Sequence, residues 1–566
     1  MVSFSLFVEL LRTRPRLLLW TMAALQAVLW TLMPVLFYAA PPGQLPLVLA
    51  IGHEFHFGTE FGPPLAFWIA EIAYRSAGMF GVYLLSQICV AVTFWAVFAL
   101  GRAIVGAPHA TMAVLLMAGI AVFSVPTPEF GPAILATPLW ALMLLNYWLG
   151  AQRGGWVHWV ALGVAASLLL LTTYAGLILI GLLALYMVAA AYGRAQLETV
   201  GPWIAGVALT AVLFPYLIWL DLSAGIRFLD LSAIEGNLRT WGWLVVALLL
   251  SHAGMVILIA LARGLVVASR DTPLVIERLP AHPAARGFVY FFALTPIVAM
   301  GLFALFSHRP ENFMAAPLVV LSGLAVVVAA GERIKIEYHY LIGYAWIALL
   351  VLPPVLMALV IVIQPWILAA DLRIGRPAEE MGQFFGDSFA RRTGQPLAVV
   401  AGDQALALLV ALAAPSRPSL YLESVVDNRS HVTRQDIAEK GAVVVWPTTD
   451  PQGRPPREIQ QQFPDLVTEV PRAFARQYQG RMPLMRVGWG MVRPRAQGNV
   501  TAPMPPPRQT RPEPPPALQP VPEPQPALPP LAPPPPQLQE PAPLPPPQPQ
   551  PQRRPLPQSP QLHGPQ

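Results

Sequence analysis

The sequence is poor in charged residues and almost free of cysteine and lysine. Charged side chains make up 12% of the 566 residues, roughly half the share that soluble proteins carry. Cys89 is the only cysteine, which excludes an intrachain disulfide and any metal site built from several cysteines. The net charge of +6 comes from arginine, since the only lysines are Lys335 and Lys440. These arginines are scattered over loops without interleaved aromatic residues, so no nucleic-acid partner is expected.

Hydrophobic residues make up 55% of the chain, and the mean hydropathy is +0.54. This value is high although residues 501–566 contain 29 of the 64 prolines and cannot form a core. A soluble globular enzyme is therefore excluded. A run of about 20 apolar residues is long enough to cross a bilayer, and the sequence predicts a polytopic α-helical membrane protein with about 11 spans. The predicted spans are 17–38, 79–100, 108–126, 132–150, 157–174, 175–193, 201–220, 241–262, 287–307, 314–331 and 339–366.

The loop arginines and lysines predict the orientation of these spans. If the N-terminus is cytoplasmic, the inner loops hold 12 of these residues and the outer loops hold four. Because positive residues accumulate in cytoplasmic loops, we expect the N-terminus inside and, with an odd number of spans, the region after residue 366 outside. The first span is longer than the apolar part of a signal peptide and is expected to be an anchor.

The pattern changes after the last span, which predicts three parts: a membrane domain over 1–366, an extracytoplasmic domain over 367–495 and a tail over 496–566. Short apolar runs at 396–403 and 442–446 alternate with helix-like segments at 404–413 and 433–440. Strands that alternate with helices predict a small α/β domain. The tail is rich in proline and glutamine, and such a composition predicts an extended, disordered segment.

Ionisable residues on the predicted outer side are few, and most of them lie in the first outer loop. His53, Glu54, His56 and Glu60 fall within eight residues of one another. Glu129 lies in the next outer loop, which is almost free of other charges. A carboxylate so close to a bilayer is costly and is a candidate site residue. The alternative for the first loop is an ordinary surface loop, with Glu60 acting only as a partner of the dipole of the following helix.

Two segments carry a resemblance to a known class of enzymes. The first is Gly58–Trp68 (GTEFGPPLAFW), and the second is Phe123–Pro132 (FSVPTPEFGP), followed by Pro138-Leu139-Trp140. With the predicted topology, residues 10–365 resemble the GT-C membrane glycosyltransferases. The most similar groups are the bacterial relatives of the dolichyl-phosphate-mannose protein mannosyltransferases and of the aminoarabinose lipid A transferases. The α/β domain after the last span fits the layout of the same groups.

The resemblance implies transfer of a sugar from a polyprenyl-phosphate carrier to an envelope acceptor, which is a lipid, a glycan or a protein. The reaction would occur at the outer face of the bacterial inner membrane. It needs a carboxylate as general base, and cationic side chains or a divalent metal to offset the charge of the lipid phosphate. The candidate substrate-binding residues are His53, Arg227, His308 and Arg309. For the two arginines the alternative is an interfacial anchor or a local ion pair, and for His53 and His56 a metal site with a glutamate is a further alternative.

The sequence departs from the family pattern at the expected base. The Asp-Glu pair of the family falls at Gln44-Leu45, and neither residue can accept a proton as a general base. The base is then Glu54, Glu60 or Glu129, or the loop is aligned differently, or catalysis has been lost. The last case would make the chain a membrane scaffold or an envelope-assembly protein. A transporter or flippase is the third hypothesis, but the predicted spans lack the repeats and mid-span charges expected of one.

The predicted orientation is testable with topology reporters. Fusions at residues 150 and 270 should report the inside, and a fusion at 400 should report the outside, because 11 spans separate the two ends of the membrane domain. An inside signal at 400 would show that one predicted span does not cross the membrane.

Overall fold

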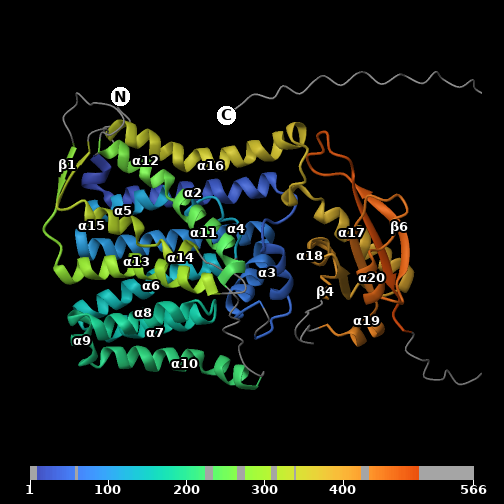
Figure 1. The fold of residues 1–566 in the computed structure, drawn as a ribbon, viewed down its shortest axis with the longest axis horizontal. Coiled ribbons are helices and arrows are strands. Elements are labelled where there is room, and N and C mark those ends of the chain that lie inside the picture. Colours follow the sequence, from blue (N-terminus) through green and yellow to red (C-terminus); the bar gives the residue numbers. More distant parts are fainter. Residues whose placement is uncertain are drawn as a thin grey trace, which may run out of the picture. The chain divides into compact units, whose positions relative to one another are not determined.

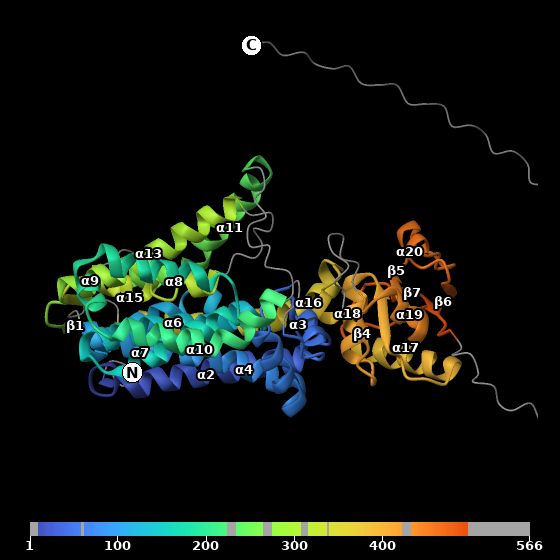
Figure 2. The ribbon, with the colours of Figure 1, turned by 90° about the horizontal axis from the view of Figure 1, so that it is seen from below.

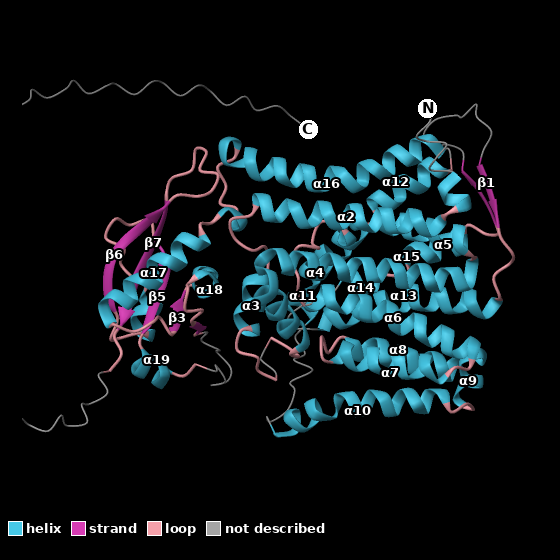
Figure 3. Cartoon of the chain, turned by 180° about the vertical axis from the view of Figure 1, so that it is seen from behind, coloured by secondary structure: helices cyan, strands magenta, loops and turns pink. Residues whose placement is uncertain are grey.

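The computed structural model describes residues 9–57, 61–222, 234–263, 274–306, 315–336, 339–421 and 432–495. All of these residues belong to one compact unit, Met1–Gly498. Helices dominate up to residue 393, and most of the strands follow it (Figure 3). The predicted tail, 496–566, lies outside the described residues.

The helices of the first part follow the apolar runs of the sequence. Several begin at a proline, which suits the first helical turn because its missing N–H would have no partner there. The helices are α2 (Pro15–Phe37), α3 (Leu45–Gly52), α4 (Leu65–Val105), α5 (Ala107–Ala118), η1 (Ala121–Phe123), α6 (Pro132–Arg153), α7 (Trp156–Leu170), α8 (Gly176–Ala189), α9 (Ala191–Leu197), α10 (Gly201–Leu222), α11 (Ile234–Ser251), α12 (Ala253–Ala262), α13 (Pro283–Phe306), α14 (Ala315–Leu318), α15 (Ser322–Ala329) and α16 (His339–Ile367).

Seven helices within the described residues are long and apolar enough to cross a membrane, and the bent pair α8–α9 would make an eighth. The chain is therefore an integral membrane protein, but the predicted count of 11 spans is not confirmed. The difference lies in three predicted spans: α5 has 12 residues, α7 has 15, and the predicted span 314–331 is divided between α14 with four residues and α15 with eight. At 1.5 Å per residue, α7 reaches only about 22 Å, less than the hydrocarbon thickness of a bilayer.

Burial separates central helices from peripheral ones. In α6, 78% of the most apolar window is buried, against 17% in α10. Helices α4, α5 and α6 share one apolar core, α2 lies alongside α16 (Figure 1), and α11 packs along α13 (Figure 2). The indole N–H of Trp241 in α11 donates to the carbonyl of Gly301 in α13 at 2.8 Å.

Helix α4 is broken about three turns after its start. Ala77 and Gly78 have non-helical backbone angles, and Gly78 combines φ 60° with ψ −149°. This region of backbone space is open essentially only to glycine. The break separates the first three turns of α4, which follow the outer loop, from the long apolar part that begins at Met79.

A two-stranded ribbon joins two loops at the other end of the helices. Strand β1 (Leu274–Glu277) pairs antiparallel with β2 (Arg333–Ile336). The guanidinium of Arg12, near the N-terminus, donates to the carbonyl of Val275 at 3.4 Å.

The C-terminal part is built on a five-stranded sheet with the strand order β4-β3-β5-β7-β6. β3 runs parallel to β4 and β5, whereas β7 is antiparallel to β5 and β6. Helices α17 and α18 pack on one face of the sheet, and α19 and α20 pack on the other. The elements are η3 (Arg373–Gly375), α17 (Ala378–Thr393), β3 (Val399–Gly402), α18 (Gln404–Ala413), β4 (Ser419–Leu420), α19 (Arg434–Lys440), β5 (Ala442–Pro447), α20 (Arg457–Gln462), β6 (Val467–Phe474) and β7 (Met485–Val492).

The edge strand β6 of this sheet is irregular. The pairing of β6 with β7 is interrupted between Glu469 and Arg472, where Val470 is 82% exposed and Pro471 supplies no N–H. At its other end the sheet finishes with β4, which is only two residues long.

Candidate active site

The first outer loop runs between α2 and α4 and contains the short helix α3. Two consecutive backbone N–H groups, those of Ala39 and Ala40, donate to the carbonyl of Ile374 at 2.9 Å. The loop then turns at Gly43, whose φ of 54° is left-handed and favours glycine. Gln44 is the N-cap of α3, and its side chain makes no capping hydrogen bond. The loop is therefore fixed at both ends by backbone contacts.

Glu129 comes from the next outer loop and lies against this turn. A methyl group at Gly43 would collide with Oε2 and Cδ of Glu129. The loop is held by the Glu129 N–H, which donates to the Pro126 carbonyl at 3.0 Å, and α6 begins three residues later. The structure therefore places the Glu129 carboxyl against Gly43, the residue before Gln44.

The burial of Glu129 acts against its charged form. Partial burial raises the pKa of the carboxyl above its ordinary value. No Arg, Lys or His in the described part of the chain forms an ion pair with it. The pKa of the Tyr38 phenol is raised to about 12, first by burial and then by the nearby charge of Glu129. A carboxylate with a raised pKa and no counter-ion is a typical general base.

A second carboxylate, Glu71 of α4, is the centre of an ion-pair cluster at the other end of α3. Its side chain is only 2% exposed. Oε1 accepts from Nε of Arg75 at 2.8 Å and lies 3.0 Å from Nδ1 of His53, and Oε2 accepts from Nη2 of Arg417 at 3.0 Å. This cluster connects the loop after α3, the start of α4 and the sheet-bearing part of the chain.

Arg417 is held in an unusual position. Its φ of 47° is left-handed, which costs a non-glycine residue about 1 kcal/mol or more. Nη2 donates to the carbonyl of Leu49, near the C-terminal end of α3, at 3.2 Å, and the guanidinium lies 4.6 Å from the centre of the Tyr74 ring. Nη1 is buried without a hydrogen-bond partner among the described residues. This cation therefore has a free donor beside the outer loop.

Glu54 has a local partner. Its Oε2 lies 3.0 Å from Nε2 of His56, and the His56 carbonyl accepts from the indole N–H of Trp68 at 3.0 Å. The structure thus brings Glu54 together with His56, and His53 together with Glu71. Neither of these two pairs is linked to Glu129 by a hydrogen bond or an ion pair between described residues.

The remaining candidates cannot be placed. Glu60, Arg227, His308 and Arg309 lie outside the described residues. In the described part of the chain, no three His, Cys, Asp or Glu side chains come together as a metal site.

The sequence analysis missed Glu71, Arg417 and the role of Gly43. One signal was available for Glu71: it is a carboxylate in an apolar helix with an arginine four residues later, which is the spacing of a helical ion pair. No local signal marks Arg417, because it meets Glu71 across 346 residues of sequence.

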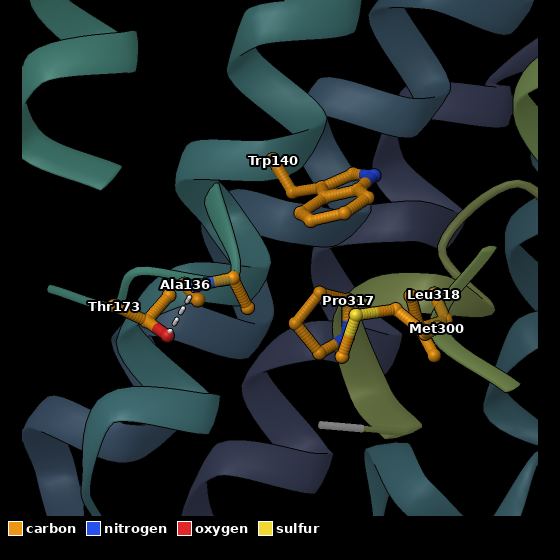
Figure 4. A pocket seen from close by; sticks show the side chains of 7 residues that line it. Ala136, Trp140, Thr173, Met300, Pro317 and Leu318 are labelled. Atoms are coloured by element: carbon orange, nitrogen blue, oxygen red, sulfur yellow. Dashed lines mark hydrogen bonds between the residues drawn. The ribbon is translucent and has the colours of Figure 1, made fainter. Parts of the chain in front are cut away.

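A narrow pocket lies deeper among the helices, where α6 passes the break between α7 and α8 (Figure 4). Its volume of about 10 Å³ leaves room for one water. The lining is apolar apart from Trp140 of α6 and Thr173, whose Oγ1 accepts from the N–H of Ala175 at 3.2 Å. This pocket is too small for a substrate.

The comparisons with known proteins agree with this architecture. Residues 62–219 match the family described as dolichyl-phosphate-mannose-protein mannosyltransferase. ArnT from Cupriavidus metallidurans bound to undecaprenyl phosphate aligns with a TM-score of 0.51 and 13% identity, over 83% of this chain and 97% of ArnT. Apo ArnT aligns over the same fractions of the two chains, with a TM-score of 0.50 and 14% identity. A comparison with curated protein sequences gives no match.

An oligosaccharyltransferase from Archaeoglobus fulgidus, in complex with Zn and sulfate, aligns with a TM-score of 0.35 and 14% identity, over 71% of this chain and 62% of its own. The fold and the family match together confirm the resemblance that the sequence motifs predict: the chain has the fold of the GT-C membrane glycosyltransferases. Within this class, the fold is that of ArnT.

The buried cluster predicts a stability effect. Glu71→Gln would leave Arg417 buried without its charge partner, and breaking a buried pair costs about 3–5 kcal/mol. We expect a clearly lower unfolding temperature for the purified full-length protein. The matched control is Glu277→Gln, since the pair between Glu277 and Arg333 is exposed on both sides, at 60% and 64%, and exposed pairs contribute below about 1 kcal/mol. Equal effects of the two substitutions would contradict the role of the cluster.

The contact between Gly43 and Glu129 predicts a specific loss of activity. Gly43→Ala should displace the Glu129 carboxyl, and a misplacement of about 1 Å can lower an enzymatic rate about 10²-fold. The control is Gly154→Ala, because Gly154 is also left-handed, with φ 65°, but has open space around its α-carbon. Both variants carry the backbone strain, and only Gly43→Ala should lose sugar transfer. A similar rate for both variants would separate Glu129 from the chemistry.

Proposed function

We propose that the chain transfers a sugar from a polyprenyl-phosphate carrier to an envelope acceptor, with Glu129 as the general base. The observation that supports this most directly is the Glu129 carboxyl against Gly43, next to the position where the family's acid is replaced by Gln44. The similarity to ArnT, whose structure is known with bound undecaprenyl phosphate, supports a carrier of the same chemical type.

The geometry fits an inverting displacement. The base takes a proton from the acceptor hydroxyl as the oxygen attacks the anomeric carbon, and the carrier phosphate leaves from the opposite side. A base must lie within hydrogen-bond reach of that hydroxyl, about 3 Å. Of the other carboxylates described in or beside the loop between α2 and α4, Glu71 is occupied by two arginines and a histidine, and Glu54 is paired with His56. Glu129 remains available for the acceptor.

The leaving phosphate needs cationic donors. Arg417 has an unpartnered Nη1, and the side chain of Arg75 is 53% exposed. Both lie at the C-terminal end of α3, whereas Glu129 lies at its N-terminal end. An eight-residue helix is about 12 Å long, so α3 separates the base from these cations by roughly the size of a sugar phosphate. Arg227, His308 and Arg309 remain proposed substrate contacts on the grounds of sequence.

We also propose where the chain lies in the cell and how it is divided into domains. We place the chain in the bacterial inner membrane with the N-terminus in the cytoplasm. Residues 367–495 then form an extracytoplasmic domain, and residues 496–566 form a Pro-rich tail.

The test is a transfer assay with full-length protein in liposomes that contain polyprenyl-phosphate sugars. Glu129→Gln keeps the size of the side chain and removes the base, and loss of a general base typically lowers the rate about 10²–10⁴-fold. The matched control is Glu54→Gln, which removes only a contact to His56 and should change the rate less than tenfold. Glu60→Gln tests the third of the three candidate bases in the same assay. Wild-type turnover by Glu129→Gln would overturn the assignment.

The pH profile provides a second readout. The base must be ionised, so transfer should fall as the pH drops through the raised pKa of Glu129, at a pH above the ordinary glutamate value of 4.5. The folded state holds this proton more tightly than the unfolded state, so ionisation of Glu129 lowers the stability of the fold above that pKa. Glu129→Gln should therefore unfold at or above the wild-type temperature at pH 7.

One observation favours a second function. Gln44 is exposed and caps nothing, which is consistent with a site that has lost its acid. If the wild type transfers no sugar from any polyprenyl-phosphate donor, and if cells without the protein accumulate no lipid-linked sugar, the chain is a membrane scaffold of envelope assembly.

A further inference from the structure

The two-stranded ribbon of β1 and β2 lies at the end of the helices away from α3 (Figure 1). Its strands run across the direction of the helices, and successive side chains of a strand point to opposite faces. On the packed face, Ile276 and Ile336 are 6% and 8% exposed and belong to the apolar core of the helices. On the open face, Glu277, Arg333 and Lys335 are exposed. The ribbon therefore presents a polar surface at the level where the helices end.

Two of the cations beside this surface have structural roles. The guanidinium of Arg333 forms an ion pair with Glu277 across the two strands. Arg278 follows β1 directly. Its backbone N–H donates to the carbonyl of Glu332 at 3.0 Å, and its Nε donates to the carbonyl of Gly331 at 3.2 Å. These contacts hold the two strands and the segments beside them together.

Three further cations, Arg12, Arg286 and Lys335, are exposed and form no ion pair with a carboxylate in the described part of the chain. Nη2 of Arg12 donates to the carbonyl of Val275 at 3.4 Å, and Val275 lies opposite Lys335 in the register of the ribbon. Arg286 lies in the first turn of α13, close enough for its charge to act on Arg278. Positive charges that gather without a counter-ion make a surface that is complementary to an anion.

An apolar side chain lies beside these cations. Leu279 is 87% exposed, more than any other large apolar side chain in the described residues, and it directly follows Arg278. Tyr290, one turn after Arg286 on α13, is 36% exposed. Apolar and aromatic side chains among cations are typical of surfaces that enter the headgroup region of a membrane. A stable protein partner would need a larger apolar contact than one leucine.

We propose that Arg12, Arg286 and Lys335 bind the phosphate of an anionic phospholipid, with Leu279 inserted among the acyl chains next to the headgroup. Helices α2 and α13 begin here and are long enough to cross the membrane, so these side chains lie where a leaflet ends. Arg and Lys are the usual partners of phosphate groups, and each cation near an anionic membrane surface strengthens binding. With the N-terminus in the cytoplasm, this lipid belongs to the inner leaflet. The site lies at the other end of the helices from Glu129 and does not depend on sugar transfer.

The experiment measures binding of dihexanoyl phosphatidylglycerol, a short-chain anionic lipid, to the full-length protein in a neutral detergent by microscale thermophoresis. Dihexanoyl phosphatidylcholine, which carries no net charge, should bind more weakly. Lys335→Gln and Arg286→Gln should each weaken binding of the anionic lipid about fivefold, the contribution of one cation near an anionic surface. The matched control is Arg457→Gln, because Arg457 is also exposed and has no ion pair among the described residues but lies in α20 of the sheet-bearing part. This control should bind as the wild type does.

Two further measurements distinguish the lipid from a free phosphate. Leu279→Ala should weaken binding of dihexanoyl phosphatidylglycerol about fivefold, because the leucine side chain no longer meets the acyl chains. Binding of glycerol phosphate, which has the headgroup chemistry without the chains, should not change in this variant. If the wild type binds both ligands equally and Leu279→Ala has no effect, the site takes a free phosphate and the assignment to a lipid is wrong.

The unfolding temperature of the delipidated protein separates binding from a structural role. Substitutions of exposed side chains without partners change stability little, so Lys335→Gln and Arg286→Gln should unfold as the wild type does. Earlier unfolding of both variants would show a structural role and overturn the proposal. It is also overturned if the two lipids bind equally, if Arg457→Gln loses as much affinity as Lys335→Gln, or if the wild type binds neither lipid, in which case the surface serves another anion, such as an acidic protein. A failure of the sugar-transfer assay changes none of these results.

Discussion

The ion-pair cluster around the Glu71 carboxylate is the interaction on which the arrangement of segments around α3 depends. The carboxylate is almost completely buried, and its two oxygens contact a histidine from the loop after α3, an arginine one turn further along α4 and an arginine from the sheet-bearing part. Such a charge is tolerable only while its partners stay in place. The cluster therefore makes three segments, distant in sequence, depend on one another.

Helix α3 extends this dependence to the proposed base. Glu129 lies beside its N-terminal end, where the helix dipole favours negative charge, and Arg417 binds the Leu49 carbonyl near its C-terminal end, where cations are favoured. The helix is short and has no side-chain cap, and it is held by its buried side chains Leu45, Val48 and Leu49 as well as by these flanking groups. The residues that follow the last span thus help to position a carboxylate that lies in the loop between the third and the fourth predicted spans.

The sequence was informative where a signal was local. Two short motifs predicted the GT-C fold, and an isolated acid in a charge-poor loop made Glu129 one of three candidate bases. The span count was less predictable, because hydropathy does not show where a helix breaks, as at Gly78 or between α7 and α8. The contact of Glu129 with Gly43 and the pairing of Glu71 with Arg417 arise only when distant segments pack together, so no pattern along the chain reveals them.

The irregular strand β6 has a consequence for the protein in its membrane. An open sheet edge is a template for pairing with a second copy, and molecules confined to one plane meet often. Here the interruption between Glu469 and Arg472 and the missing N–H of Pro471 break the row of donors, and β4 leaves only two residues at the opposite edge. Both edges therefore disfavour pairing between the sheets of neighbouring copies, and the sheet is kept as a separate surface on every molecule even at high density.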